Sequence, residues 1–228
     1  MLLLAVAGCA PATAPATPPP TPLPAMSRAI RYVALGDSYT IGTSVTAAER
    51  FPDQLVAALA GRVDLQLVAN LGVNGYTSAD LIADELPTLA GLAPDLVTLL
   101  IGVNDVVRGV PLAGYRVNVR HILDRLLELL PPARIVVVSI PDYTRTPSGG
   151  LFGDPAQQRA AIGAANAAMA EEAAGRGIAF VDIGAVADEA AIDRTLVAGD
   201  GLHPSGAQYA RWVELIAPVV AGLFAGDA

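Results

Sequence analysis

Three residues in this sequence have side chains that could together carry out acyl transfer: Ser38, Asp200 and His203. A serine hydroxyl is a weak nucleophile unless an adjacent base removes its proton. An imidazole suits that task because its unperturbed pKa of about 6.5 lies close to neutral pH. His203 is the only histidine outside the long helices that we expect, and Asp200 is close enough in the same loop to fix its tautomer.

Acyl transfer also needs hydrogen-bond donors that are already directed at the oxyanion before it develops. The backbone N–H groups of Ser38 and Gly72 and the side-chain amide of Asn104 are the candidates, since each follows an apolar run of the chain. This chemistry requires no cofactor.

The elements that must position these residues alternate along the chain. Apolar runs predict strands at 30–35, 65–70, 96–101, 134–140 and 177–183, and helical spacing predicts helices at 51–61, 79–89, 115–130, 156–174, 185–192 and 205–224. Such alternation is typical of a parallel sheet with helices on both faces, a three-layer α/β/α sandwich. The carboxyl ends of parallel strands share one edge, where such folds bind ligands, so we expect the candidate residues to meet there.

Four sequence blocks resemble those of the SGNH (GDSL-type) serine hydrolases and occur in the family's order, from about Arg28 to the last helix. The blocks are Gly36-Asp37-Ser38, Gly72, Gly102-Val103-Asn104-Asp105 and Asp200-Gly201-Leu202-His203-Pro204. The resemblance implies a flavodoxin-like, five-stranded parallel sheet and hydrolysis of esters or thioesters. It implies Ser38 as nucleophile, Gly72 and Asn104 as oxyanion donors, His203 as base and Asp200 as the residue that orients it.

Three further residues are candidates for contact with substrate: Tyr39, Asn74 and Val103. Tyr39 stands where many members of the family carry leucine, which leaves the substrate subgroup open. Asn74 could equally hold its turn, and Val103 could equally be ordinary packing at a strand end. The loop 142–155 could form a lip of the acyl pocket, because functional loops are common at that edge. Asp37 and Asp105 are expected to hold turns through backbone hydrogen bonds.

Composition excludes several classes of function. The 228 residues carry a formal net charge of -8 and all basic residues are arginine, so no basic stripe is expected for a nucleic acid. Cys9 is the only cysteine, which leaves neither a disulfide framework nor a cysteine-based zinc site. The only histidines are His121 and His203, and we expect His121 to lie on a solvated helix surface, so no metal site is predicted.

The N-terminal region predicts export and anchoring. Residues 1–9 are apolar and end in Val6-Ala7-Gly8-Cys9, which resembles a bacterial lipobox whose cysteine becomes lipidated. Residues 10–27 are rich in Pro, Ala and Thr and would form an extended spacer of up to about 50 Å. We expect the hydrolase domain at 28–228. No Lys or Arg precedes the apolar run, so translation could start upstream of Met1, or instead at Met26, which would make the protein cytoplasmic.

The sequence thus predicts a serine esterase that hydrolyses carboxylic esters of small or short-to-medium acyl groups through an acyl-enzyme. Lipidation of Cys9 would tether it to a bacterial cell envelope. A carbohydrate O-acetyl esterase and a lysophospholipase or thioesterase are alternatives within the same chemistry. A catalytically silent envelope binding protein is the alternative from another class. The sequence carries no signal for the oligomeric state.

Overall fold

A single five-stranded sheet organises residues 28–226, the part of the chain that the computed structural model describes. Its strands are β1 (Ile30–Gly36), β2 (Leu65–Asn70), β3 (Leu96–Leu100), β4 (Ile135–Val138) and β5 (Ala179–Val181). They lie in the order β2-β1-β3-β4-β5, and every neighbouring pair is parallel. The predicted five-stranded parallel sheet is therefore confirmed.

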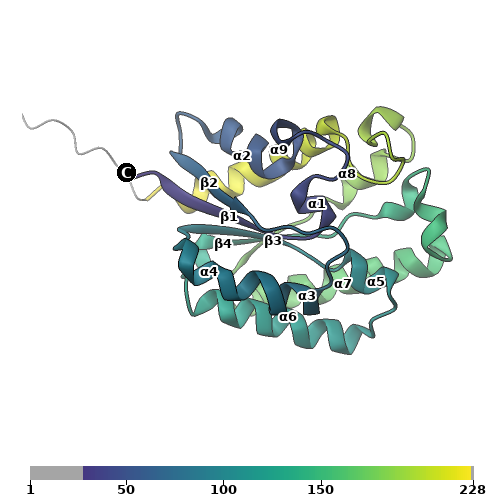
Figure 1. Cartoon of the computed structure of the whole chain (residues 1–228), viewed down its shortest axis with the longest axis horizontal. Helices are drawn as coiled ribbons and strands as arrows, with labels where there is room; N and C mark the ends of the chain where they lie inside the picture. The colour runs from purple at the N-terminus through teal and green to yellow at the C-terminus, as the bar shows by residue number, and fades with distance from the viewer. Residues whose placement is uncertain (1–27, 227–228) are drawn as a thin grey trace, which may run out of the picture.

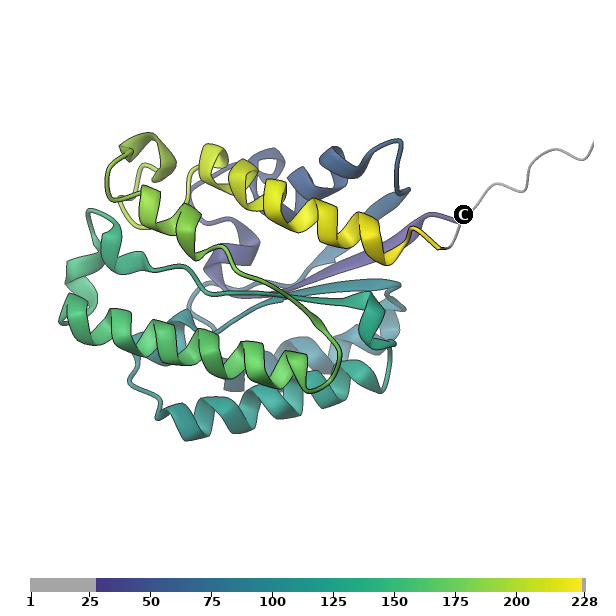
Figure 2. The same cartoon turned by 180° about the vertical axis from the view of Figure 1, so that it is seen from behind.

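Helices cover both faces of this sheet and complete the predicted three-layer sandwich. In Figure 1, α2, α8 and α9 lie above the sheet, and α4, α6 and α7 lie below it. The view from behind shows the long helices α9 and α7 on opposite faces (Figure 2). The helices are α1 (Ser38–Ile41), α2 (Phe51–Leu59), α3 (Ser78–Asp80), α4 (Leu86–Leu92), α5 (Val103–Val107), α6 (Leu112–Leu127), α7 (Pro155–Ala174), α8 (Gly184–Glu189) and α9 (Gly206–Leu223).

The core forms on both sides of the central strands. All five residues of β3 are buried, and residues 32–35 of β1 are completely inaccessible to solvent. Such continuous apolar runs are typical of parallel strands that are covered on both faces. Leu55 of α2, Leu126 of α6 and Trp212 of α9 reach the same core, and complete burial of a side chain of this size contributes about 1.5–3 kcal/mol.

Some element boundaries differ from those that the sequence predicts. β4 ends at Val138 because the N–H and C=O groups of Ile140 bond to the side chain of Asn166 on α7, at 2.8 and 2.9 Å, instead of extending the ladder. The helix predicted at 79–89 runs from Ser78 to Leu92 in three segments, with a π-helical turn at Leu81–Glu85. The short helices α1 and α5, which directly follow β1 and β3, were not predicted.

The register of the central strands sets the level at which their loops begin. Gly36, at the end of β1, pairs with Leu100, at the end of β3. Ala34 of β1 pairs with Asn70, the last residue of β2. The loops after β1, β2 and β3 therefore start side by side at the carboxyl edge of the sheet, where open parallel sheets bind ligands.

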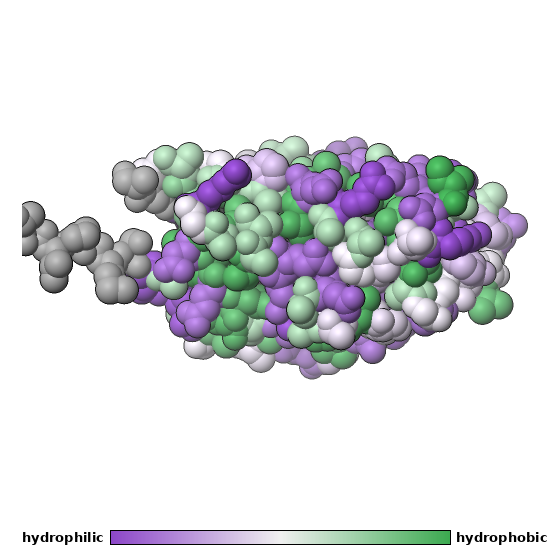
Figure 3. Space-filling view, turned by 90° about the horizontal axis from the view of Figure 1, so that it is seen from above, coloured by the Kyte–Doolittle hydropathy of each residue, from purple (hydrophilic) through white to green (hydrophobic). Residues whose placement is uncertain are grey.

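The predicted lipobox with Cys9 and the linker 10–27 lie outside the described residues. Of the helices within residues 28–226, none combines the length and the apolarity needed to cross a membrane. Hydrophilic and hydrophobic residues are interspersed over the surface that includes α2 and α9 (Figure 3).

Candidate active site

The turn between β1 and α1 presents Ser38 at the carboxyl edge of the sheet. Ser38 is the first residue of α1, and the side chain of Asp37 caps that helix by accepting a 3.0 Å hydrogen bond from the N–H of Tyr39. Gly36 has a φ of 151°, and a Cβ there would lie 2.2 Å from the carbonyl oxygen of Leu100. Only glycine therefore allows the chain to leave β1 so close to β3.

His203 and Asp200 form a hydrogen-bonded pair in the loop before α9. Nδ1 of His203 lies 2.6 Å from Oδ2 of Asp200. Oδ1 of the same carboxylate accepts the N–H groups of Leu202 and His203 at 2.8 and 3.0 Å. Burial alone would raise the pKa of Asp200, but hydrogen bonds from Ser44, His203 and the two backbone N–H groups outweigh it and hold that pKa well below its usual range. Asp200 is thus an anion that can fix the imidazole's tautomer.

Two other segments hold this loop in place. Ser44 follows α1 and donates a 2.6 Å hydrogen bond from Oγ to Oδ2 of Asp200. Ser148 donates its N–H to the carbonyl of Gly201 at 2.8 Å and its hydroxyl to the carbonyl of Asp200 at 3.2 Å. The position of the His203–Asp200 pair therefore depends on contacts with both the Ser38 segment and the loop after β4.

A cavity of about 240 Å³ opens where these segments meet. Ser38 and His203 line the same cavity, and Asp200 lies behind His203. Of the predicted substrate contacts, Tyr39, Asn74 and Val103 all belong to the cavity wall. The complete lining is Ser38, Tyr39, Thr43, Asn74, Gly75, Val103, Asn104, Val107, Tyr143, Phe152, Leu202 and His203.

Gly72 does not belong to this lining. Its N–H donates a 3.1 Å hydrogen bond to Oδ1 of Asn70, and a Cβ on it would lie 2.7 Å from the backbone nitrogen of Ile41. Gly72 therefore allows the β2 loop to pack tightly against α1, and this geometry does not direct its N–H at the cavity. Gly75, three residues later, does line the cavity and has a φ of 82°.

Asn104 lies in the first turn of α5 with its side chain at the cavity. Its Nδ2 donates to the carbonyl oxygen of Tyr76 at 2.9 Å, which fixes the orientation of the amide. An amide NH₂ has two N–H donors, so the second is available to a ligand. Asn74, in contrast, is exposed and its Oδ1 accepts the hydroxyl of Thr43, so it links the β2 loop to the segment after α1.

Comparison with known families agrees with this constellation. The model of the GDSL-like lipase/acylhydrolase family matches residues 34–211, which include the Ser38 turn, the β3 loop and the His203 loop. The chain belongs to this family. It is accordingly a carboxylic ester hydrolase, and the resemblance to the GDSL-type hydrolases that the sequence suggests is confirmed. A search of curated protein sequences finds no match.

Solved structures share the fold of this GDSL-like hydrolase. TesA is 21% identical, with a TM-score of 0.66 over 85% of this chain and 99% of that one. Axe2, an acetylxylan esterase from Geobacillus stearothermophilus, is 21% identical, with a TM-score of 0.65 over 86% and 94% of the chains. LAE5, an alpha/beta hydrolase enzyme from the metagenome of Lake Arreo, Spain, is 23% identical, with a TM-score of 0.63 over 87% and 97%. At these identities the likeness concerns the fold.

The loop after β4 gives this GDSL-like hydrolase an aromatic wall that sequence reasoning did not identify. Tyr143 and Phe152 lie on two short 3₁₀ helices, Tyr143–Arg145 and Gly149–Phe152, and pack edge to face with ring centroids 5.9 Å apart. The hydroxyl of Tyr143 donates to Gln158 at 2.6 Å. Loop 142–155 thus lines the cavity, in agreement with its predicted role as a lip of the acyl pocket.

Three acidic side chains are buried around the Ser38 turn of this hydrolase. Burial raises the pKa of Asp37 to about 7 and that of Glu85 to about 9, and it also raises the pKa of Asp105. Asp105 accepts the N–H and hydroxyl of Ser78. Asp37 therefore holds its own turn, as predicted, whereas the side chain of Asp105 joins α5 to the start of α3, 27 residues away. Glu85 carried no recognisable motif.

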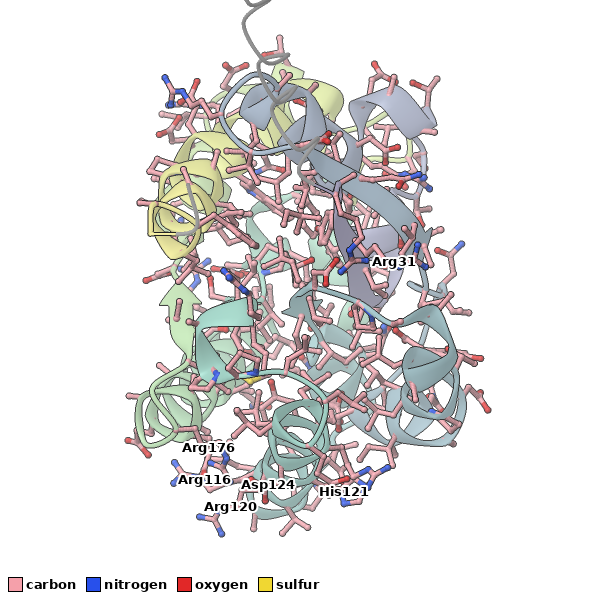
Figure 4. The ribbon with its side chains drawn as sticks, turned by 90° about the vertical axis from the view of Figure 1, so that its left-hand side faces the viewer. Arg31, Arg116, Arg120, His121, Asp124 and Arg176 are labelled. Carbon is pink, nitrogen blue, oxygen red and sulfur yellow. The ribbon has the colours of Figure 1, made fainter. Side chains whose placement is uncertain are left out.

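No group of potential ligands in residues 28–226 has the arrangement of a metal centre. Outside the site, an ionic cluster joins α6 to α7, with Arg120 and Arg176 each 2.9 Å from a carboxylate oxygen of Glu172. Figure 4 shows His121 at the surface of α6, on a different side of that helix from Arg116 and Arg176. Its position is the solvated helix face that the sequence predicts.

Proposed function

We propose that this hydrolase is a serine esterase that cleaves carboxylic esters through an acyl-enzyme on Ser38. The observation that carries the proposal is that Ser38 and His203 line one cavity while Asp200 holds Nδ1 of His203 at 2.6 Å. With Nδ1 held, Nε2 is the nitrogen left to act as the base.

The proposed reaction has two balanced halves. His203 takes the Ser38 proton as Oγ forms a bond to the carbonyl carbon, and then gives that proton to the departing alcohol oxygen. Water next attacks the acyl-enzyme, loses a proton to His203, and releases the acid as the proton returns to Ser38. Asp200 remains ionised throughout and stabilises the imidazolium that forms in each half.

The oxyanion donors of this proposal are the N–H groups of Ser38 and Gly75 and the amide of Asn104. Ser38 is the first residue of its helix, so its N–H has no intrahelical partner. No acceptor among residues 28–226 takes the N–H of Gly75. Gly72, the donor expected from the sequence, already donates to Asn70.

The cavity supports small or short-to-medium acyl groups. Its volume of about 240 Å³ is below the ~300–1,000 Å³ that is common for small-molecule sites. One part of the wall is apolar, with Val103, Val107 and Leu202, and would exclude water from an acyl chain. A carbohydrate O-acetyl esterase is the second candidate, because Thr43 and Asn74 place polar atoms in the same wall and could contact a sugar hydroxyl. A lysophospholipase or thioesterase would use the apolar part for a longer chain.

The cellular location is proposed from the sequence: export and lipidation of Cys9 on a bacterial cell envelope. The described chain begins at Arg28, beside the start of β1, whereas Ser38 follows its end. An anchor reached through residues 10–27 would therefore leave from the edge of the sheet opposite the cavity.

Cys9→Ser should abolish labelling by an alkyne fatty acid in a bacterial host and release the protein from membranes. Start of translation at Met26 would instead give an unlabelled cytoplasmic protein of lower mass.

The catalytic proposal is tested on the whole chain with a fluorophosphonate probe and p-nitrophenyl esters of increasing length. We expect the probe to label Ser38, and Ser38→Ala to lose labelling and turnover. Thr195→Ala, which removes an exposed hydroxyl that bonds to Asp193 in its own turn, is the matched control. Well-folded wild-type protein with neither labelling nor turnover would favour the silent binding protein. Turnover of acetate esters alone would favour the O-acetyl esterase.

A further inference from the structure

The ring of Tyr39 packs directly against the imidazole of His203. The two ring centroids are 5.1 Å apart and the planes are inclined by 52°. Tyr39 is only 2% exposed, so little of the ring is available to a substrate even though it borders the cavity. Its main neighbour at the site is therefore the imidazole.

Further aromatic side chains hold the Tyr39 ring from behind. Trp212 of α9 stacks near it, with centroids 6.5 Å apart and planes inclined by 25°. Tyr209 and Phe51 both pack against Trp212, at 5.0 and 6.4 Å, and the Tyr209 hydroxyl donates to the carbonyl of Tyr39 at 2.9 Å. Aromatic residues make up only 5% of the sequence, so this concentration behind one histidine is a specific feature.

The hydroxyl of Tyr39 contributes nothing to this arrangement. It is buried and has no hydrogen-bond partner among residues 28–226, and a buried polar group without a partner costs free energy. The contact with His203 is made by the ring, and the 5.1 Å between the two centroids is within the range at which an aromatic ring attracts a cation.

We propose that Tyr39 is a positioning residue whose buried ring orients the imidazole of His203 and favours the imidazolium that forms when Ser38 loses its proton. The proposal rests on the proposed esterase reaction, in which the proton moves from Ser38 Oγ to His203 Nε2. A leucine at position 39 would fill part of the space but would offer no π face. Tyr39 would then affect the rate by acting on the base, without contact with the acyl group.

Other charged or titratable groups also lie near this histidine, and none of them is changed in the Tyr39 variants. Asp200 binds the imidazole from its own loop, and Asp37 caps α1 next to Tyr39. Tyr143 comes from the loop after β4 and Tyr209 from α9. Burial, with charge repulsion from these neighbours, holds the pKa of Tyr39 well above its usual range. The effect of the ring is therefore isolated by comparing a variant that keeps the ring with one that lacks it.

The test compares Tyr39→Phe with Tyr39→Leu in the whole chain. We expect Tyr39→Phe to keep kcat/KM within about twofold, because it retains the ring. Tyr39→Leu should lower kcat about fivefold with KM within about twofold. His203 must be neutral to act as the base, and loss of the Tyr39 ring should make its imidazolium form less favourable. The acid limb of the kcat/KM profile should therefore move down by about half a pH unit. Tyr39→Met is a second ringless variant if the leucine variant fails to fold.

Three results would overturn the proposal. Tyr39→Leu could match the wild type, Tyr39→Phe could lose as much as Tyr39→Leu, or the leucine variant could raise KM alone, which would indicate substrate contact. An NMR titration of the two imidazoles provides a readout without hydrolysis, with His121 as internal reference. If the wild type hydrolyses no ester, the esterase proposal fails, whereas an unchanged His203 titration in Tyr39→Leu would refute the role of Tyr39 separately.

Discussion

The backbone N–H of Gly36 donates a 3.0 Å hydrogen bond to Oε2 of Glu85, a side chain that is only 3% exposed. Glu85 ends the π-helical turn Leu81–Glu85, and such turns often occur at functional sites. Its other carboxyl oxygen has no partner in the described part of the chain. A neutral carboxylic acid thus supports the glycine that precedes the Ser38 turn.

Glu85→Gln should flatten the dependence of stability on pH. Burial raises the pKa of Glu85 from 4.5 to about 9, so between these values the folded protein keeps a proton that the unfolded chain loses. The stabilisation is complete below about pH 4.5 and is lost as the pH rises through about 9. Glutamine stays neutral and still accepts from Gly36, so this loss, on the order of 5 kcal/mol at pH 8, should disappear.

Urea unfolding of the wild type and Glu85→Gln from pH 5 to pH 9 would measure how steeply the free energy of unfolding depends on pH. Glu214→Gln, which removes an exposed carboxyl on α9, is the control for a general change in charge. Parallel curves for wild type and Glu85→Gln would refute the neutral-acid interpretation.

Ser44 supports Asp200 from a strained backbone position. It has a φ of 67°, which is unfavourable for residues other than glycine, and its hydroxyl donates to Asp200 at 2.6 Å. We expect Ser44→Ala and Ser44→Gly to lower kcat/KM about fivefold, because both remove the hydrogen bond to a charged group. Thermal unfolding should separate them, with the glycine variant about 1 kcal/mol more stable. Full activity in Ser44→Gly would mean that the backbone turn at residue 44, and not the hydrogen bond to Asp200, supports the activity.

Asn104 and Asn74 line the same cavity but should differ in their effect on the rate. Asn104→Ala removes a donor aimed at the proposed oxyanion and should lower kcat about 10²–10³-fold with little change in KM. Asn74→Ala removes a side chain whose oxygen accepts from Thr43 and should stay within about threefold. Steady-state kinetics on one short-chain ester tests both, and equal losses in the two variants would contradict the assignment of the donor.

The sequence was sufficient to predict that Ser38 and Asn104 would meet, because the carboxyl ends of parallel strands share one edge. His203 could be placed with them only because the loop before the last helix is able to fold back over that edge. The sequence could not show which of Gly72 and Gly75 is the better candidate oxyanion donor, because both glycines lie in one turn. Only the packing of Gly72 against Ile41 and its hydrogen bond to Asn70 distinguish them. The helices α1 and α5 are four and five residues long, too short to show a period.

The supporting contacts could not be predicted for a different reason. Glu85 is 49 residues from Gly36, and Ser44 is 156 residues from Asp200. Neither belongs to a motif, and each contact depends on how two distant segments pack. Tyr39 is a predicted substrate contact and does line the cavity, but the sequence could not show that its ring is buried and packs against His203.

Phe152 should limit the length of the acyl group. It closes one side of the cavity through its edge-to-face contact with Tyr143, and it is 36% exposed, so its removal opens the wall without a buried void. Phe152→Ala should raise kcat/KM for esters two to four carbons longer than the wild-type optimum and lower it for shorter ones, since burial of each methylene contributes about 0.8 kcal/mol. A series of p-nitrophenyl esters measures the shift. Leu151→Ala, which changes the 83% exposed neighbour, should leave the profile unchanged. A uniform loss across all lengths in Phe152→Ala would show that the ring supports the loop and does not set the length of the pocket.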